Sequence, residues 1–299
     1  MRRKSKTADP RLLLYKERNA SECMNAAFDF MRQNWRILLR YSIYILLPVC
    51  IIQTVGIVSV VDAMLAKASD APLSDMFTFF VLAAVGFVLL NAMLWTMFKL
   101  YHDRPDGLAT VTGSMFRKLF WPMLWRMTIA FIPIVVIMVP ALALSTIIML
   151  FMPIAFFVYM VAALPVLLIA PIYALEDVSI FTAIRRAFVL GFRKIGVLLL
   201  MAITLYVMVY VMQGITLVPM ALLGYFRALL IEPTFALGSS PLAQVMGKSL
   251  FNLSSVVFCY VSYLSVAVVM VSGAYLYGTA VQQGEDRSIL ADIENFENL

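Results

Sequence analysis

The chain has 299 residues, of which 63% are hydrophobic and only 13% are charged, and its formal net charge is +6. Soluble domains are about half apolar and about a quarter charged, so this composition excludes a soluble globular protein and indicates an integral membrane protein. A transmembrane helix needs about 20 apolar residues, so the length allows several spans but no sizeable soluble domain. The three cysteines lie far apart, which excludes a disulfide framework and a cysteine-based metal motif.

The N-terminal part of the chain predicts a basic tail, an amphipathic helix and two spans. Residues 1–20 are polar and basic, and we interpret them as a cytoplasmic tail. A helix is predicted to begin at Ser21, because apolar residues then recur at helical spacing. Arg36 lies away from its apolar face, and Arg32 belongs to the same basic cluster. The two predicted spans are Tyr41–Leu65 and Met76–Phe98.

A second amphipathic segment is predicted within Lys99–Arg126, where Arg117 and Lys118 follow the polar side. Span three, Met127–Leu150, and span four, Pro153–Leu175, follow with almost no polar residue between them, which predicts a tight hairpin. Each of these spans contains prolines, which kink membrane helices because a backbone hydrogen bond is lost. We therefore expect bent helices, which either pack closely or frame a cavity.

The third amphipathic helix, predicted over Ser179–Lys194, has the clearest pattern in the chain. One arc is apolar and contains Ile180, Ile184, Ala187, Phe188, Gly191, Phe192 and Ile195. The opposite side carries Arg185, Arg186 and Arg193. This pattern is typical of a helix in the membrane interface, with its cations toward lipid headgroups. Glu176 and Asp177 precede it and are predicted to cap it and to pair with Arg185 or Arg186.

The last part of the chain predicts two more spans, Ile195–Pro219 and Leu253–Tyr277, separated by a long external segment, Met220–Phe251. The tail after them is acidic, and its apolar spacing predicts a small helix that docks on the inner face. The expected organisation is all-α and polytopic, with six transmembrane helices and three cytoplasmic-side amphipathic helices. It divides into a basic tail at 1–20, a membrane domain at 21–280 and an acidic tail at 281–299.

The positions of the cations predict the topology. Of the 23 Lys and Arg residues, only Lys67, Arg227 and Lys248 fall in external loops of the six-span arrangement. The positive-inside rule then places both termini in the cytoplasm, in a multi-pass protein of a bacterial inner membrane. An interfacial helix followed by two spans recurs three times, with Ala27-Phe28 matching Ala187-Phe188. This threefold repeat is either a true duplication or a similarity of composition alone.

The sequence contains little that indicates chemistry. The cores of the predicted spans hold no ionisable residue, which weighs against a proton- or sodium-coupled pump. We interpret His102, the one histidine, as a solvated loop residue, because no second histidine or cysteine is positioned to complete a metal site. No phosphate-binding loop or nucleophile motif is present, so we expect no catalytic residue, no cofactor and no metal.

The basic clusters are the candidate binding residues. They are predicted to bind anionic lipid headgroups, or they serve only to set the topology. The predicted headgroup ligands are Arg32, Arg36, Arg117, Lys118, Arg185, Arg186, Arg193 and Lys194. We expect no nucleic-acid partner, because these charges lie against a membrane.

One stretch, residues 173–188, carries a family resemblance. Its sequence is Tyr-Ala-Leu-Glu-Asp-Val-Ser-Ile-Phe-Thr-Ala-Ile-Arg-Arg-Ala-Phe. It resembles a group of poorly characterised bacterial six-span membrane proteins, which includes the membrane domain that accompanies some glycerophosphodiester phosphodiesterases. In that group a serine often follows Ala-Ile-Arg-Arg, where this chain has Ala187. The end of the chain, from Tyr275 onward, is also similar. The resemblance implies a membrane module without known chemistry and carries over no catalytic residue.

Three hypotheses for the function follow. The first is a non-enzymatic membrane protein that binds lipid, preferentially anionic, or an amphipathic small molecule, and in one version moves it across the membrane. The second is a scaffold or accessory subunit of another membrane protein. The third is a lipid-modifying enzyme that uses Glu176, Asp177 and His102.

Overall fold

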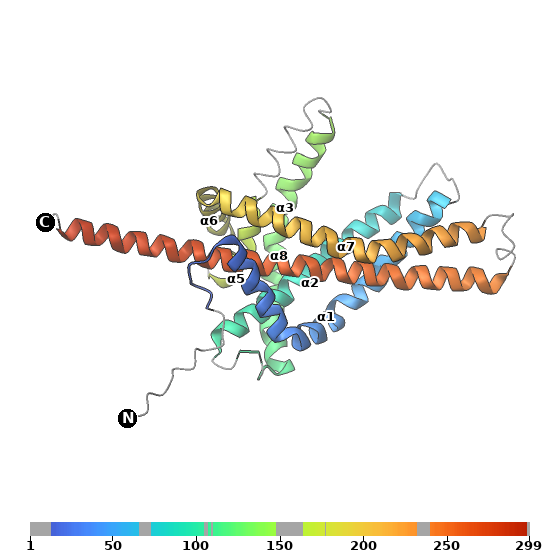
Figure 1. The fold of residues 1–299 in the computed structure, drawn as a ribbon, viewed down its shortest axis with the longest axis horizontal. Coiled ribbons are helices and arrows are strands. Elements are labelled where there is room, and N and C mark those ends of the chain that lie inside the picture. The colour runs from blue at the N-terminus through green and yellow to red at the C-terminus, as the bar shows by residue number, and fades with distance from the viewer. Residues whose placement is uncertain are drawn as a thin grey trace.

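The computed structural model describes residues 13–65, 73–104, 107–108, 110–147, 164–176, 178–231 and 240–297. These residues are all-α, with seven α-helices and one 3₁₀ helix (Figure 1). In chain order the elements are α1 (Ala20–Leu65), α2 (Leu73–Asp103), α3 (Gly113–Ile147), η2 (Leu164–Leu168), α5 (Ile169–Leu175), α6 (Ile180–Arg193), α7 (Ile195–Ile231) and α8 (Pro241–Glu297).

Four helices among the described residues are long and apolar enough to cross a membrane. They are Ala20–Asp62, Phe77–Asp103, Ile195–Leu230 and Pro241–Gln283. The architecture is therefore that of a multi-pass membrane protein. The predicted end of span three and the first half of span four fall on residues 148–163, which lie outside the described residues.

The first two amphipathic segments are not separate helices. In α1 the first amphipathic segment continues without a break into span one, and Pro48 lies inside the helix. In α3 the second segment continues into span three in the same way. The physical reason is that the sequence changes polarity at these boundaries without supplying a helix-ending residue. Only the third segment forms a helix of its own, α6.

The predicted external segment and tail are more helical than expected. α7 extends to Ile231 and α8 begins at Pro241, so most of Met220–Phe251 belongs to these two helices. α8 is 57 residues long and continues through the acidic tail. The predicted small docking helix is therefore wrong. The tail forms the last turns of α8, which run away from the other helices (Figure 1, red).

The best-buried side chains lie where α1, α2 and α8 meet. They include Phe30, Trp95, Phe98 and Tyr275, all almost fully inaccessible. The ring of His102 lies 4.3 Å from that of Phe98, and its Nδ1 is 2.9 Å from the Phe98 carbonyl oxygen. The solvated-loop interpretation of His102 is wrong, because α2 continues to Asp103 and carries the histidine into this aromatic cluster.

A close contact between α2 and α8 positions the middle of the bundle. The Tyr263 hydroxyl donates to the side-chain oxygen of Gln53 at 3.0 Å, which joins α8 to α1. The same hydroxyl lies against Gly86 of α2, so closely that a Cβ atom at Gly86 would overlap it. The lack of a side chain at Gly86 is therefore what allows the three helices to meet there.

We expect Gly86→Ala to destabilise the protein, because the added methyl group must displace the Tyr263 ring and its hydrogen bond to Gln53. Overpacking of this kind costs about 1–3 kcal/mol, which should lower the melting temperature in detergent. The matched control is Gly214→Ala on α7, where no atom lies within 4 Å of the new methyl group. Equal melting temperatures for the two variants would contradict this account.

Candidate functional site

Helix α6 presents its cations outward because its opposite side is made of small residues. Ser179 is the N-cap, and its hydroxyl oxygen accepts from the Thr182 backbone N–H at 3.4 Å. Three small residues, four positions apart, are buried against the neighbouring helices: Ala183, Ala187 and Gly191. A Cβ atom on Gly191 would lie 2.7 Å from the Pro165 Cβ of η2, so the two backbones approach closely.

The predicted apolar arc of α6 is thus divided between two environments. Its small members, Ala187 and Gly191, face the protein, whereas Phe192 is exposed. Phe181, which belongs to no predicted face, is 82% exposed. Small side chains permit close helix contact, and bulky aromatic side chains on the free edge suit a membrane interface. Arg185, Arg186 and Arg193 are also exposed, on the same outer side of the helix.

The Glu176 carboxylate joins α6 to the rest of the bundle (α5 and α8). One of its oxygens accepts from the Arg186 guanidinium, and the other accepts from the Tyr277 hydroxyl of α8. The Glu176 side chain is 22% exposed, and that of Arg186 is 52% exposed. The predicted pairing of Glu176 with Arg186 is present in the structure.

Glu176 was predicted to cap the N-terminus of α6, and this prediction is wrong because the residue caps a different helix. Glu176 is the C-cap of α5, and the N-cap of α6 is Ser179. The physical reason is that Glu176 precedes the first turn of α6 by too many residues to meet its free N–H groups. Asp177, the other predicted capping residue, lies outside the described residues.

Arg126 of α3 completes the cap of α5. Its guanidinium donates to the carbonyl oxygens of Tyr173 at 2.6 Å and Glu176 at 3.0 Å, and it lies 4.8 Å from the centre of the Tyr173 ring. The last carbonyl groups of a helix lack partners within the helix and carry partial negative charge, so a cation there is stabilising. Arg126 thereby fixes the end of α5 and, with it, the position of Glu176.

An open groove runs along α6 beside these contacts. It has a volume of about 540 Å³ and is lined from α5, α6 and α8. The lining residues are Glu176, Thr182, Arg185, Arg186, Val189, Leu190, Ala280 and Val281. We call this set the α6 groove. It combines two guanidinium groups and a carboxylate with apolar walls, which is the mixture of surfaces that an amphipathic ligand requires.

Lys194 is directed inward. It is the C-cap residue of α6, and its ammonium group donates to the side-chain oxygen of Gln283 on α8. It lines a second open groove, of about 330 Å³, together with Arg18 from the segment before α1. Of the predicted headgroup ligands on α6, Lys194 is therefore the one already engaged with α8.

The remaining predicted headgroup ligands form a separate group on α1 and α3. Arg32, Arg36, Arg117 and Lys118 are all exposed. The Tyr41 ring of α1 lies 4.1 Å from the Phe116 ring of α3, which brings the two basic segments together. Trp121 and Trp125 are exposed on the following turns of α3, as expected at a membrane interface. None of these residues lines the α6 groove.

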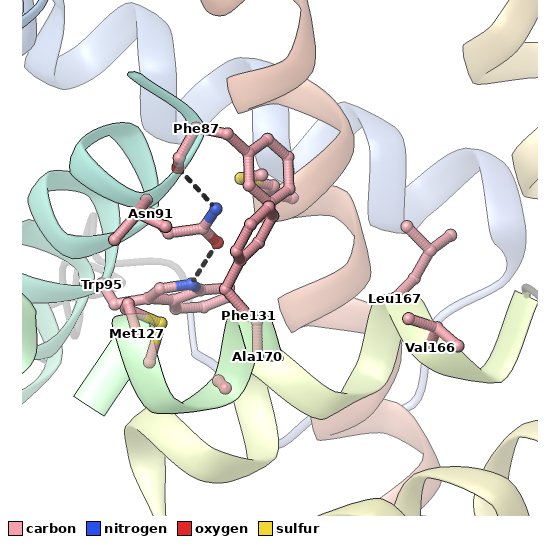
Figure 2. Close-up of a pocket in the computed structure, with 11 residues that line it drawn as sticks. Phe87, Asn91, Trp95, Met127, Phe131, Val166, Leu167 and Ala170 are labelled. Carbon is pink, nitrogen blue, oxygen red and sulfur yellow. Dashed lines mark hydrogen bonds between the residues drawn. The ribbon is translucent and has the colours of Figure 1, made fainter. Parts of the chain in front are cut away.

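An apolar crevice lies deeper in the bundle (Figure 2). Its volume is about 90 Å³, and α2, α3, η2, α5 and α8 line it. The Asn91 amide, its main polar group, donates to the Phe87 carbonyl oxygen at 2.8 Å and accepts from the Trp95 indole N–H at 3.2 Å. Asn91 therefore has partners within its own helix, and the crevice suits only an apolar occupant.

The third hypothesis requires Glu176 and His102 to share one site, and the geometry separates them. The His102 ring lies 6.4 Å from that of Tyr275, whereas Glu176 accepts from Tyr277. Two residues along an α-helix differ in direction by about 200°, so these tyrosines face opposite sides of α8. Within the described ranges, no group of three His, Cys, Asp or Glu side chains is placed to hold a metal ion.

Sequence reasoning missed Arg126, Tyr277 and Gln283 as partners of the site. Each lies far along the chain from the residue it contacts, and no local pattern encodes such a pairing. Arg126 lies just before the predicted start of span three, where the sequence alone shows it only as one more cation at the end of a span.

Comparison with known proteins gives no family to which the chain can be assigned. No protein-family model matches it, and neither a curated protein nor a solved structure does.

We expect Glu176→Ala to loosen α6 from α8, because it removes the acceptor for both Arg186 and Tyr277. Hydrogen bonds to charged groups contribute about 1.5–3 kcal/mol each, and exposure of Arg186 reduces its share. The melting temperature in detergent should therefore fall, and Glu176→Gln should have an intermediate effect because its amide oxygen still accepts from Tyr277. Asp103→Ala, which removes an exposed carboxylate on α2, is the control and should have no such effect.

Proposed function

We propose that the protein binds anionic phospholipid, with the headgroup in the α6 groove. The observation that carries the proposal is the pairing of Arg185 with Arg186 on one wall of this groove. Arg186 already has a carboxylate partner in Glu176, whereas Arg185 has no ion pair with any described residue. A headgroup phosphate would supply a counter-ion to Arg185.

The surroundings of the groove suit a lipid better than a soluble anion. Val189 and Val281 line it, and Phe181 and Phe192 stand exposed on the adjoining edge of α6. An aromatic edge beside a cationic side allows a helix to lie at the boundary between headgroups and acyl chains. Each Lys or Arg near an anionic membrane surface contributes about 1 kcal/mol of attraction. Movement of the bound lipid across the membrane is an extension of the same proposal.

We also propose the six-span arrangement with both termini in the cytoplasm. Two further spans would be α3 with the residues after it, and the returning segment that ends in η2 and α5. At 35 residues, α3 is long enough for a span, since a helix rises about 1.5 Å per residue. The basic residues of α1, α3 and α6 would then all lie on the cytoplasmic side.

A scaffold role is the second candidate, and α8 favours it. This helix extends beyond every other element at its C-terminal end (Figure 1). A long helix that leaves the bundle offers a surface to another membrane protein without disturbing the α6 groove. A stoichiometric partner lost on truncation after Gln283 would support this role.

Arg185→Gln should weaken the retention of phosphatidylglycerol, because it removes the groove cation that has no ion pair with any described residue. From the attraction of about 1 kcal/mol, we expect roughly a fivefold loss, measured by native mass spectrometry after extraction from mixed phosphatidylcholine and phosphatidylglycerol vesicles. Arg117→Gln removes an equally exposed cation outside the groove and is the matched control. Equal losses for both variants would mean that diffuse charge, and not the groove, attracts the lipid.

The topology is tested by a single added cysteine. The natural cysteines, Cys23, Cys50 and Cys259, are all buried and should react slowly with a membrane-impermeant maleimide. In a six-span protein Met152→Cys lies between spans three and four, so it should react from outside the cell. Gly113→Cys, at the start of α3, is the control and should react only in inverted vesicles. Reaction of Met152→Cys only in inverted vesicles would contradict six spans and leave four.

A further inference from the structure

The end of the bundle opposite α6 contains a second, differently built cationic site. Arg227, near the end of α7, donates to the carboxylate of Asp62, near the end of α1. Arg227 is only 8% exposed, and its guanidinium lies 5.6 Å from the centre of the Phe251 ring of α8. Three helices therefore surround this cation at the end where α1 and α7 finish and α8 begins (Figure 1).

The guanidinium of Arg227 is only partly satisfied. Its Nη2 group donates to Asp62, but its Nη1 group is buried and has no hydrogen-bond partner among the described residues. A buried charged donor without an acceptor is unfavourable, so native proteins rarely leave one in place. Arg227 also lines a cavity of about 150 Å³, together with Leu230, Gln244 and Lys248. This volume is several times the roughly 30 Å³ of one liquid water molecule.

The charges around the cavity favour an anion. Two cations, Arg227 and Lys248, line it, and within the part of the chain that the structure describes the only ion pair of either is that of Arg227 with Asp62. Gln244 lies in the first turn of α8, where the helix dipole adds partial positive charge. A guanidinium and an ammonium group that converge on a small cavity are the donors that bind phosphate groups in proteins.

We propose that this cavity binds a phosphate group, carried either by a lipid headgroup or by a soluble phosphate. Nη1 of Arg227 and the Lys248 ammonium group are its principal donors. The site lies at the opposite end of α7 and α8 from the α6 groove, so it is independent of the lipid site proposed there. Arg227 and Lys248 are two of the three cations that the six-span arrangement places in external segments, and the fold brings them together.

Two variants separate a specific site from a general effect of charge. Lys248→Gln removes one donor at an exposed position, where the fold should tolerate the change. The double variant Asp62→Asn with Arg227→Gln removes one negative and one positive charge, so the net charge of the site stays the same. If the Arg227 guanidinium and the Lys248 ammonium group together bind the phosphate, both variants should lose binding. Arg193→Gln, an exposed cation of α6 outside this cavity, is the matched control.

The measurement uses the full-length protein in phosphatidylcholine nanodiscs. Titration with inorganic phosphate, against chloride at equal ionic strength, should raise the melting temperature of the wild type and of Arg193→Gln. In Lys248→Gln the apparent affinity should fall by roughly fivefold, because an ion pair of an exposed cation contributes up to about 1 kcal/mol. In a parallel arm, native mass spectrometry measures phosphatidylglycerol retained from mixed vesicles.

The two arms identify the source of the phosphate group. Stabilisation by inorganic phosphate without retained phosphatidylglycerol indicates a soluble ligand, and retention that Lys248→Gln reduces but Arg185→Gln does not indicates a lipid. The proposal is overturned if neither arm shows binding, or if Lys248→Gln binds as well as the wild type. Because Lys248 is exposed, this decision stands even where the double variant does not fold. Failure of the α6 groove proposal would show separately, as an Arg185→Gln variant that retains lipid normally.

Discussion

The position of helix α6, and of its exposed arginines, depends on the Glu176 carboxylate. Arg126 holds the end of α5, Glu176 ends that helix, and its two oxygens bind Arg186 of α6 and Tyr277 of α8. Four helices therefore converge on one residue. The Glu176 side chain is only 22% exposed, and hydrogen bonds to a partly buried carboxylate are stronger than those at a fully exposed position. Without them, α6 would be held mainly by its small residues.

Helix α8 contacts most of the other helices. It packs along α1 and α7 and also contacts α2 and α5. Around Gly278, α8 approaches the segment before α1 so closely that a Cβ atom on this glycine would overlap the Leu14 carbonyl oxygen. The neighbouring Thr279 hydroxyl donates to the Lys16 carbonyl oxygen at 3.0 Å. Because Tyr275 and Tyr277 face opposite sides, one helix supports both the aromatic cluster and the Glu176 contact. Helix α8 thus joins the aromatic cluster to the Glu176 contact.

The sequence predicted the elements well where hydrophobic periodicity and helix ends coincide. α6 was expected at Ser179–Lys194 and is found with Ser179 as its N-cap and Lys194 as its C-cap. The prediction failed where polarity changes but the backbone has no reason to stop, as between the amphipathic part of α1 and its span. His102 was misplaced for the same reason, because α2 continues past the last apolar residues. A change in side-chain polarity marks where a chain meets a membrane surface, but a helix ends only where the backbone hydrogen bonds end.

The sequence shows which basic residues the candidate sites contain, but not how buried they are or which residues they contact. Clusters of arginine can be counted in a sequence, and their attraction to anionic lipid follows from charge alone. Whether such a cluster distinguishes one anion from another depends on burial, since an exposed cation keeps its water and binds many anions weakly. Arg185 is exposed and Arg227 is not, although both are arginines on helices. That difference arises from Asp62 and Phe251, which approach Arg227 from two other helices. The exposed group therefore suits recruitment of a lipid surface, and the buried one suits selection of a particular anion.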